Sequence, residues 1–345
     1  MKELLKELIK IPSPSRDEGA VADFLEAYML SKGLDVHRKG HNLWVESEPF
    51  SENRPTILLN AHIDTVKPVQ AYSFNPFEPF EKDGAIFGLG SNDDGGSLVT
   101  LLFAYMELVK RPQPYRLVFS ATAEEEVSGV GGIEMIFDEI GPIALGIIGE
   151  PTGMRPAVAE KGLMVLDCTS FGKSGHAARN EGVNAIYEAL PDIDWFRNYT
   201  FERVSEYNGA VKMSVTQINA GTQHNVVPAE CKFVVDVRNN GMYTNPELLS
   251  LIKQKVKCAV KERSVRLNGS SIDVSHPFVQ KCVSMGLEPF GSPTTSNQSL
   301  CHFTTVKIGP GDSSRSHTAD EYILEKELSE GLSIFVKLLD GLDLN

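Results

Sequence analysis

The sequence contains no long apolar run and no excess of basic residues. No stretch approaches the ~18 consecutive apolar residues that a membrane-spanning helix needs, and the charged first 15 residues lack the apolar core of a secretory signal. Lys and Arg number 33 against 46 Asp and Glu, which gives a formal net charge of −13. Because proteins bind phosphates mainly through Lys and Arg, this balance disfavours nucleic acids and anionic membranes as partners.

Cysteine is also scarce. The five cysteines are scattered, at positions 168, 231, 258, 282 and 301, and form no C-x-x-C pair. This arrangement argues against a zinc ribbon and predicts reduced thiols in a cytoplasmic protein. Apolar residues are plentiful, at 41% of 345, which is typical of a soluble globular protein with about two domains.

The first part of the chain alternates between strand-like and helix-like segments. Apolar runs typical of buried strands occur at 42–46, 56–61, 116–121 and 145–148, and a helix is predicted at 97–109. Ser15 followed by Glu18 resembles a capping box at the start of an earlier helix that stops at Gly33. Strands that alternate with helices predict an α/β layer with a largely parallel sheet.

The middle of the chain has a different pattern. Strand-like alternation occurs at 162–170, 210–218, 231–237 and near 264–267, with helices predicted at 184–196 and 246–257. This strand-helix-strand-strand-helix-strand order is typical of a compact α+β unit of the split βαβ kind. We therefore predict an inserted domain over residues 158–271, between the two halves, 1–157 and 272–345, of a larger domain.

Five short polar clusters stand out, and four of them lie at the end of a predicted strand or in the loop after one. Their candidate residues are His62 and Asp64, Asp93 and Asp94, Glu124 to Glu126, Glu150, and His317. Open α/β sheets place their sites at the carboxyl ends of the strands, so these side chains are expected at one edge. In an extended segment Asp64 can accept a hydrogen bond from the ring of His62.

Each cluster also has an ordinary explanation when it is taken alone. The His62 and Asp64 pair could lie on the surface, segment 88–96 could be a glycine-rich turn with a helix cap, and the three glutamates could form a solvated loop. A dinucleotide-binding loop does not fit, because G-x-G-x-x-G requires glycine at position 93, where the chain has Asp93. Adjacent carboxylates suit a cation instead.

Together the clusters supply ligands for two metal ions. Two Zn²⁺ ions carry a formal charge of +4. This charge is cancelled by −1 from a shared hydroxide and −3 from three carboxylates, which are Asp93 as a bridge, Glu126 and Glu150. A neutral cluster avoids the desolvation cost of an unpaired charge in a dry site. Two ions ~3.5–4 Å apart can share a hydroxide while they polarise a carbonyl oxygen.

As an ordered set, these motifs resemble the dinuclear zinc deacylase and exopeptidase family that includes acetylornithine deacetylase, succinyl-diaminopimelate desuccinylase and glutamate carboxypeptidase. The similarity covers essentially the whole chain and implies a zinc-exopeptidase-like α/β fold, a mixed, mainly parallel sheet sandwiched by helices. The inserted domain would be a ferredoxin-like lid and dimerisation domain. One zinc would be held by His62, Asp93 and Glu150, the other by Asp93, Glu126 and His317, and the bond between Asp93 and Asp94 would be a cis peptide.

The resemblance further implies roles in catalysis. Glu125 would be the general base and Asp64 the partner of His62. His176, reaching a neighbouring subunit's active site, would stabilise the oxyanion, although without the resemblance it would be taken as a cap in a glycine-rich turn. Residues matched to substrate-binding segments are Asn225, Arg238 and Thr295.

The implied reaction is hydrolysis of the amide of an N-acyl-L-amino acid by a zinc-bound hydroxide. The motifs look closest to enzymes for N-acetyl-L-ornithine, or for N-acetyl- or N-succinyl-citrulline, in arginine biosynthesis. The expected cofactors are two Zn²⁺ per subunit, with Co²⁺ as a substitute, in a cytoplasmic homodimer. Gly95 and Asn297 depart from the Lys and Asp of relatives. Alternatives are a dipeptidase or tripeptidase, a succinyl-diaminopimelate desuccinylase, or a metal-binding module without activity.

Overall fold

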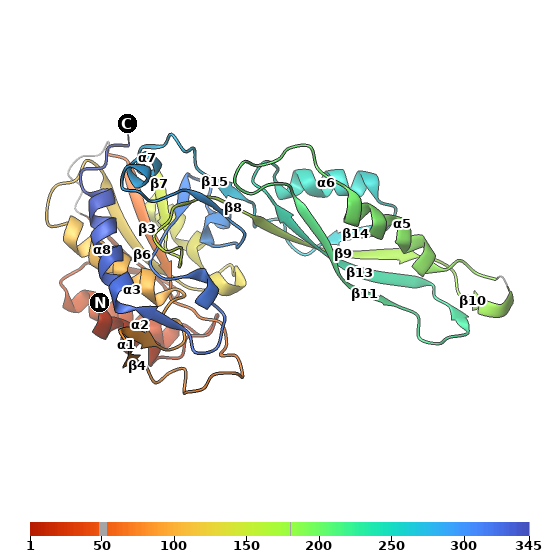
Figure 1. Ribbon diagram of the computed structural model, residues 1–345, viewed down its shortest axis with the longest axis horizontal. Coiled ribbons are helices and arrows are strands. Elements are labelled where there is room, and N and C mark those ends of the chain that lie inside the picture. The colour runs from red at the N-terminus through yellow and green to blue at the C-terminus, as the bar shows by residue number, and fades with distance from the viewer. Residues whose placement is uncertain (48–53, 180, 345) are drawn as a thin grey trace. The chain divides into compact units, whose positions relative to one another are not determined.

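The computed structural model describes residues 1–47, 54–179 and 181–344, which form two compact units (Figure 1). The first unit comprises Met1–Val158, Ser271–Phe290 and Ser296–Asn345, and the second comprises Ala159–Ser270 and Gly291–Thr295. The short segment Gly291–Thr295, predicted with the first unit, lies with the second. The reason is local hydrogen bonding, because the Lys161 amide donates to the Ser292 carbonyl (3.1 Å) and the Thr295 hydroxyl donates to the Lys161 carbonyl (3.0 Å).

A mixed sheet is the main feature of the first unit. Its strands run in the order β1-β2-β6-β3-β7-β17-β8-β15, with β16 beside β8. Their bounds are β1 Val36–Lys39, β2 Asn42–Glu46, β3 Thr56–His62, β6 Arg116–Thr122, β7 Leu145–Ile148, β8 Ala157–Glu160, β15 Ser270–Ser271, β16 Phe290–Ser292 and β17 Thr305–Lys307. The central strands β6, β3, β7 and β17 are parallel to one another, so their carboxyl ends meet at one edge. The predicted α/β fold with a mainly parallel sheet is confirmed.

Helices accompany this sheet. They are α1 Lys2–Ile9, α2 Gly19–Ser31, α3 Gly95–Leu108, α4 Phe137–Ile140, α7 Pro277–Ser284 and α8 Glu325–Leu339. The helix α3 packs against β3 and α8 and buries most of its residues. Every residue of β3 is also buried, as expected for a parallel strand covered on both faces. A small sheet of order β18-β5-β4 consists of β4 Phe80–Lys82, β5 Ala85–Phe87 and β18 Tyr322–Leu324.

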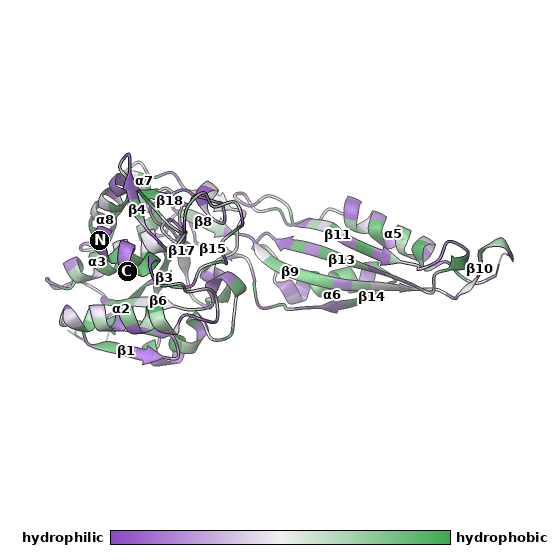
Figure 2. Cartoon of the chain, turned by 90° about the horizontal axis from the view of Figure 1, so that it is seen from below, coloured by the Kyte–Doolittle hydropathy of each residue, from purple (hydrophilic) through white to green (hydrophobic). Residues whose placement is uncertain are grey.

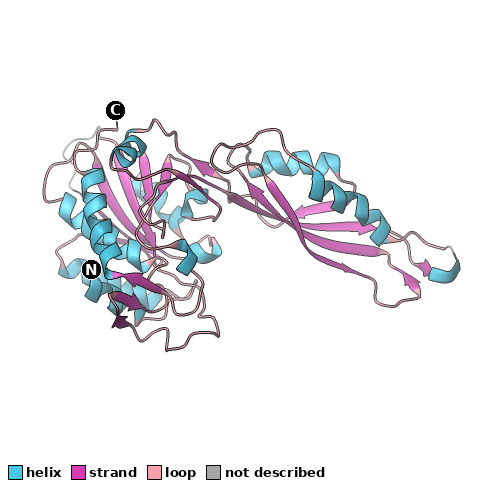
Figure 3. Ribbon diagram, in the orientation of Figure 1, coloured by secondary structure: helices cyan, strands magenta, loops and turns pink. Residues whose placement is uncertain are grey.

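The second unit follows the predicted order of elements. They are β9 Gly162–Phe171, α5 Ala185–Asn198, β11 Lys212–Ala220, β13 Glu230–Asn239, α6 Asn245–Lys255 and β14 Ala259–Glu262. The strands form an antiparallel sheet in the order β11-β13-β9-β14, the arrangement of a ferredoxin-like domain. Both helices lie on one face of this sheet (Figure 3). Burial therefore alternates along β9, and Figure 2 shows the matching alternation of hydropathy along β9 and β13.

The end of the second unit differs from the prediction. Its last strand is β14, whereas the sequence pattern predicted a strand near 264–267. Asp192 of α5 sets the earlier start, because its carboxylate accepts the backbone amides of Lys257 (3.0 Å) and Cys258 (2.7 Å) just after α6. A further short pair is formed by β10 Gly175–His176 and β12 Val226–Val227. Among the residues that the structure describes, no helix is both long and apolar enough to cross a membrane.

Candidate metal centre

His62 is the last residue of β3, and its ring lies between two acidic residues. The ring is 1% exposed, with Nδ1 2.8 Å from the backbone oxygen of Asp64 and Nε2 3.2 Å from Oδ1 of Asp93. Burial disfavours the protonated ring, but the carboxylates of Asp64 and Asp93 outweigh burial and hold the pKa of His62 well above its ordinary value. Because Asp64 holds Nδ1, the other ring nitrogen, Nε2, is directed toward Asp93 and the acidic residues around it.

The acidic residues that follow the neighbouring strands meet His62 at the same edge. Potential ligand atoms of His62, Glu125 and Glu150 lie within 4.8 Å of one another, and so do those of His62, Asp93 and Glu126. Glu125 and Glu126 follow β6, and Glu150 follows β7. Parallel strands β6, β3 and β7 therefore deliver these side chains to one place, as the strand-end argument predicted.

His317 joins this cluster from near the carboxyl end of the chain. Its Nε2 atom lies 2.9 Å from Oε2 of Glu126 and 3.6 Å from Oδ2 of Asp93. The hydrogen bond to Glu126 is the main reason that the pKa of His317 is raised to about 9. All five residues predicted to bind metal thus lie together in the first unit.

The cluster concentrates negative charge in a place where water has little access. The side chain of Glu125 is 10% exposed and that of Glu126 is 7% exposed. Burial, followed by repulsion from neighbouring carboxylates, raises the pKa of Glu125 to about 8 and that of Glu150 well above its ordinary value. Cations would relieve this repulsion, and a set of imidazole nitrogens and carboxylate oxygens suits Zn²⁺. The residues therefore fit a divalent metal ion.

The Asp64 carboxylate, predicted to accept a hydrogen bond from the His62 ring, lies 3.5 Å from Nδ1, and it is the Asp64 backbone oxygen that lies at 2.8 Å. The carboxylate accepts the backbone amides of Glu125 (3.0 Å) and Glu126 (3.1 Å) and the hydroxyl of Ser15 (2.7 Å). The capping box predicted for Ser15 is wrong, because α2 begins after Glu18 with no side-chain cap and the Ser15 hydroxyl is used at Asp64. Asp64 thus fixes both the His62 ring and the backbone that carries Glu125 and Glu126.

Glu124, the first of the three glutamates, turns away from the cluster. Its backbone is left-handed, with φ 56°, and its Oε2 accepts the amide of Gly131 at 3.3 Å. A Cβ atom on Gly129 would lie 1.7 Å from Glu124 Oε2, so a larger residue there would force the Glu124 side chain to shift. The Glu124 amide itself donates to Oε1 of buried Glu18 (3.1 Å). Glu124 therefore shapes the loop, while Glu125 and Glu126 face the cluster.

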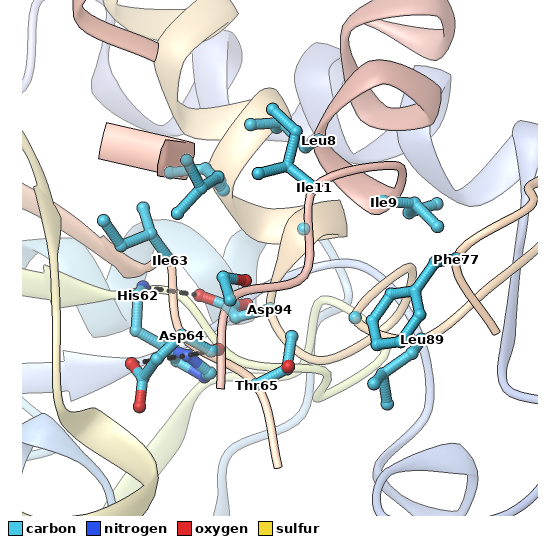
Figure 4. Close-up of a pocket in the computed structure, with 15 residues that line it drawn as sticks. Leu8, Ile9, Ile11, His62, Ile63, Asp64, Thr65, Phe77, Leu89 and Asp94 are labelled. Atoms are coloured by element: carbon cyan, nitrogen blue, oxygen red, sulfur yellow. Dashed lines mark hydrogen bonds and ion pairs between the residues drawn. The ribbon is translucent and has the colours of Figure 1, made fainter. Parts of the chain in front are cut away.

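Asp93 and Asp94 are joined by the cis peptide bond that the resemblance implied. Asp94 lines a pocket together with His62 and with Leu8 and Ile9 of α1, and its Oδ2 accepts the His62 amide at 3.3 Å (Figure 4). Burial raises the pKa of Asp94 to about 7. A Cβ atom on the next residue, Gly95, would lie 2.4 Å from the carbonyl oxygen of Gly90, so the lysine of many relatives would require this loop to move.

Asn297, the second departure, belongs to a buried polar network. Its Nδ2 donates to Oδ1 of Asn60 (3.1 Å) and to the hydroxyl of Thr122 (3.3 Å), and Asn60 donates to Ser120 (3.0 Å). These residues tie β3 and β6 to the segment around Asn297. An aspartate would be acceptor-only and would lose both of the donated hydrogen bonds.

The remaining predicted residues lie in the second unit. His176 is exposed in β10, and its Nδ1 accepts the amide of Ala178 at 3.1 Å. Asn225 lies in the adjacent segment, where its carbonyl accepts the amide of Ala177. Arg238 of β13 is paired with both carboxylate oxygens of Asp236, at 2.9 and 3.2 Å. Within this unit, His176 and Asn225 are therefore neighbours.

The sequence of this chain matches a known protein family over most of its length. The profile described as "Peptidase family M20/M25/M40" matches residues 58–341 of this chain. The chain belongs to this family. Its members are metallo-hydrolases, and this M20 protein is accordingly a metal-dependent amidohydrolase that acts on a small molecule.

Individual relatives match nearly the whole chain. The succinyl-diaminopimelate desuccinylase of Orientia tsutsugamushi is 24% identical over 342 residues, which are 94% of this chain and 85% of that protein. The LysW-lysine/LysW-ornithine hydrolase of Sulfurisphaera tokodaii is 26% identical over 99% of this chain and 95% of that protein. A solved tripeptidase structure from Staphylococcus aureus has a TM-score of 0.77 at 21% identity and covers 98% of this chain and 96% of that one, which supports the fold.

Three residues that hold the cluster in place were not predicted from the sequence. They are Ser15, Glu18 and Glu321, all of which bind the loops that carry the candidate ligands. For Glu321 a signal was present, since it lies in the same polar motif as His317 and directly precedes a strand. For Ser15 and Glu18 the local pattern pointed to a helix cap, and only the tertiary contacts show otherwise.

Proposed function

We propose that the protein hydrolyses the amide bond of an N-acyl-L-amino acid at a centre of two divalent metal ions. The observation that carries this proposal is the cluster of five candidate ligands around an additional buried carboxylate. The five are His62, Asp93, Glu126, Glu150 and His317, and the additional carboxylate is Glu125. Such a cluster provides both the ligands and a separate group for proton transfer.

In the proposed centre, Asp93 would be a ligand shared by two ions, because its Oδ1 faces His62 and its Oδ2 faces His317. His62 and Glu150 would be the other ligands of the first ion, and Glu126 and His317 those of the second. When bound, Zn²⁺, or Co²⁺ as its substitute, would polarise the amide carbonyl and lower the pKa of a water molecule.

Glu125 is the proposed general base. Its Oε2 lies 3.9 Å from Nε2 of His62, so the carboxylate reaches the centre without being one of the proposed ligands. Burial and like charge raise its pKa to about 8, which marks a carboxylate that takes up a proton readily. Glu125 would accept a proton from the attacking water and pass it to the leaving amine nitrogen. Asp64 holds the Glu125 amide and would keep this side chain in position.

Basic residues of the second unit are the proposed contacts for substrate carboxylates. Arg238 is paired in register with Lys212 of β11 and with Leu163 of β9, and Lys161 lies two residues before Leu163. Because paired residues and residues two apart point to the same side, the three basic side chains share the helix-free face. Desolvation and the nearby charges of Lys212 and Arg238 lower the pKa of Lys161, as expected for neighbours.

This basic group favours a substrate with two carboxylates. Asp236 compensates one of the three positive charges, through its pair with Arg238, and leaves two. An amino-acid carboxylate and an acyl group with its own carboxylate, such as succinyl, would match them. The succinyl-diaminopimelate desuccinylase among the relatives points the same way. Candidate substrates therefore include N-succinyl-diaminopimelate and N-succinyl-citrulline, besides the N-acetyl-L-ornithine and N-acetyl-citrulline of arginine biosynthesis.

A substrate panel tests the proposed function. Acetyl and succinyl derivatives of ornithine, citrulline, lysine and diaminopimelate would be assayed for amine release with Zn²⁺ or Co²⁺, beside free dipeptides and tripeptides. We expect kcat/KM for succinyl substrates to exceed that of matched acetyl substrates by about tenfold or more, since one added charge-assisted contact contributes about 1.5–3 kcal/mol. Faster cleavage of free peptides would identify a peptidase instead, and bound metal without any hydrolysis would identify an inactive module.

We also propose a homodimer formed through the second unit, in keeping with the predicted lid. The outer side of α5 exposes Tyr187 (69%) and Leu190 (52%), and the neighbouring edge strand β11 exposes Ile218 (53%). Large apolar side chains beside an unpaired strand edge are typical of an interface between subunits. In such a dimer His176 would serve the partner's centre, where an imidazole N–H would stabilise the oxyanion.

Mixed dimers test the proposed role of His176. His176→Ala and Glu125→Gln chains, each expected to be nearly inactive alone, should regain about a quarter of wild-type activity when mixed in equal amounts and allowed to exchange subunits, because half of the dimers are then hybrids with one working centre of two. Such a hybrid holds one centre with both an intact Glu125 and an intact His176. The assay is turnover against mixing ratio, with subunit exchange checked by mass. Exchange without any recovery would contradict a centre shared between subunits.

A further inference from the structure

Glu321 is a buried carboxylate whose oxygens are both occupied by backbone amides. It lies four residues after His317, directly before β18, and is 2% exposed. Oε1 accepts the amides of Asn92 (2.8 Å) and Asp93 (2.9 Å), and Oε2 accepts the amide of Gly90 (2.9 Å). Because its acceptors face these amides, Glu321 is not arranged as a ligand for a metal ion itself.

The loop that carries Asp93 depends on these contacts for its shape. Between β5 and α3 the chain has no regular secondary structure at residues 88–94, and both Gly88 and Gly90 have positive φ angles, 152° and 74°. Buried amides without a partner would be costly, so three of them converging on one carboxylate fix the course of the backbone. The Asp93 amide is among the three, and the direction of the Asp93 side chain is fixed with it.

Glu321 also connects this loop to the segment that carries His317. Its own carbonyl accepts the amide of Gly88 at 3.0 Å, so main chain and side chain of one residue hold both ends of the loop. Asp93 and His317 are 224 positions apart in the sequence, yet they must face each other at a distance suited to one ion. The Asp93 amide itself donates to Glu321, so this connection acts directly on the backbone of the residue that faces His317.

We propose that Glu321 is a positioning residue that determines how tightly the centre binds divalent metal, by holding the Asp93 loop in register with His317. The proposal rests on the proposed function, because it assumes that Asp93 and His317 bind metal. It predicts that Glu321 acts on metal affinity through the backbone of the loop and not only on the stability of the fold.

The test compares Glu321→Gln with Asp320→Asn in the full-length chain. Glutamine has nearly the size of glutamate, but its NH₂ group would face the Gly90 amide or the amides of Asn92 and Asp93, donor against donor. Asp320 is the matched control, because its carboxylate accepts the amide and hydroxyl of Ser73 (both 2.8 Å) and its loss removes the same charge. Asparagine also tolerates the left-handed φ of 57° at this position.

Affinity for Zn²⁺ and Co²⁺ would be measured by competition with a chelating dye, together with the visible spectrum of bound Co²⁺. We expect Glu321→Gln to bind both ions about 10–100-fold more weakly than wild type, as for partners that hold metal ligands in other proteins, with an altered Co²⁺ spectrum. Asp320→Asn should remain within about twofold to threefold. If the Glu321→Gln protein is insoluble, the same measurements can be made on Glu321→Asp, because the shorter aspartate side chain cannot reach all three amides.

Several results would overturn the inference. A lower melting temperature of the metal-free Glu321→Gln protein with unchanged affinity would show a purely structural role. An equal loss of affinity in Asp320→Asn would show that charge, not positioning, is responsible. A wild-type chain that binds neither ion overturns the proposed centre and this inference together, whereas equal binding by wild type and the Glu321 variants overturns this inference alone.

Discussion

The Glu125→Gln variant is expected to lose about a thousandfold or more in kcat while it retains its metal ions. The amide has nearly the same shape as the carboxylate, but it cannot take a proton from water or return one to the leaving amine. General acid–base catalysis by one side chain typically contributes about 10²–10⁴-fold, and here the same group acts in both steps. Because Glu125 is not a proposed ligand, metal content should change little.

The neighbouring glutamate is a matched control for this variant. Glu124→Gln changes the same chemical group one residue earlier, on a side chain that contacts Gly131 and not the acidic cluster. Its kcat should stay within about threefold of wild type, since glutamine keeps one oxygen to accept the Gly131 amide. Turnover would be measured with the best substrate of the panel, and metal content by elemental analysis. A Glu125→Gln protein with full metal content and near-normal turnover would rule out Glu125 as the base.

Removal of the metal ions is expected to reduce activity below about 1% and to make stability strongly dependent on pH. Without metal, the folded cluster holds extra protons, because the pKa of Glu125 is raised to about 8 and that of His317 to about 9. Unfolding returns these groups to ordinary values near 4.5 and 6.5. For the histidine, the stabilisation is present below pH 6.5 and is lost as the pH rises through 9. For the glutamate, the folded state becomes less favoured as the pH rises from 4.5 to 8.

Both groups therefore lower the stability of the metal-free protein as the pH increases from 6 to 9. We expect the melting temperature of the metal-free protein to fall by about 5 °C or more over this range, because a few kcal/mol shift the melting temperature by several degrees in a protein of this size. With metal bound, the ligands carry no extra protons and the decrease should be much smaller. Differential scanning calorimetry after chelation, and after readdition of Zn²⁺, would measure both curves. Parallel curves with and without metal would contradict a metal centre at these residues.

Much of the fold could be predicted from local patterns. Runs of apolar residues marked β3, β6 and β7, and alternation marked the strands of the second unit, because these periods reflect which faces are buried. The boundaries of strands and units that depend on contacts between distant residues could not be predicted from local patterns. The start of β14 depends on Asp192, 65 residues before Lys257 in the sequence. The grouping of Gly291–Thr295 with the second unit likewise depends on hydrogen bonds to Lys161.

By itself the sequence determined which side chains could form the acidic cluster. His62, Glu125 and Glu150 each follow an apolar run, and the carboxyl ends of parallel strands must share an edge, so their meeting follows from the order of strands. The chemical type of the cluster, carboxylates with two histidines, is also present in the sequence and indicates a site for divalent metal.

Only the tertiary structure decided how this cluster is held. The Ser15 hydroxyl reaches Asp64 across 49 positions, Glu18 reaches the Glu124 amide across 106, and Glu321 reaches the Gly90 amide across 231. A local pattern cannot specify which buried carboxylate will satisfy which distant amide, because that pairing depends on how loops of irregular shape pack together. For the same reason, the one glutamate of three that faces away from the cluster was identified by its backbone angle and its glycine neighbours, and not by its place in the sequence.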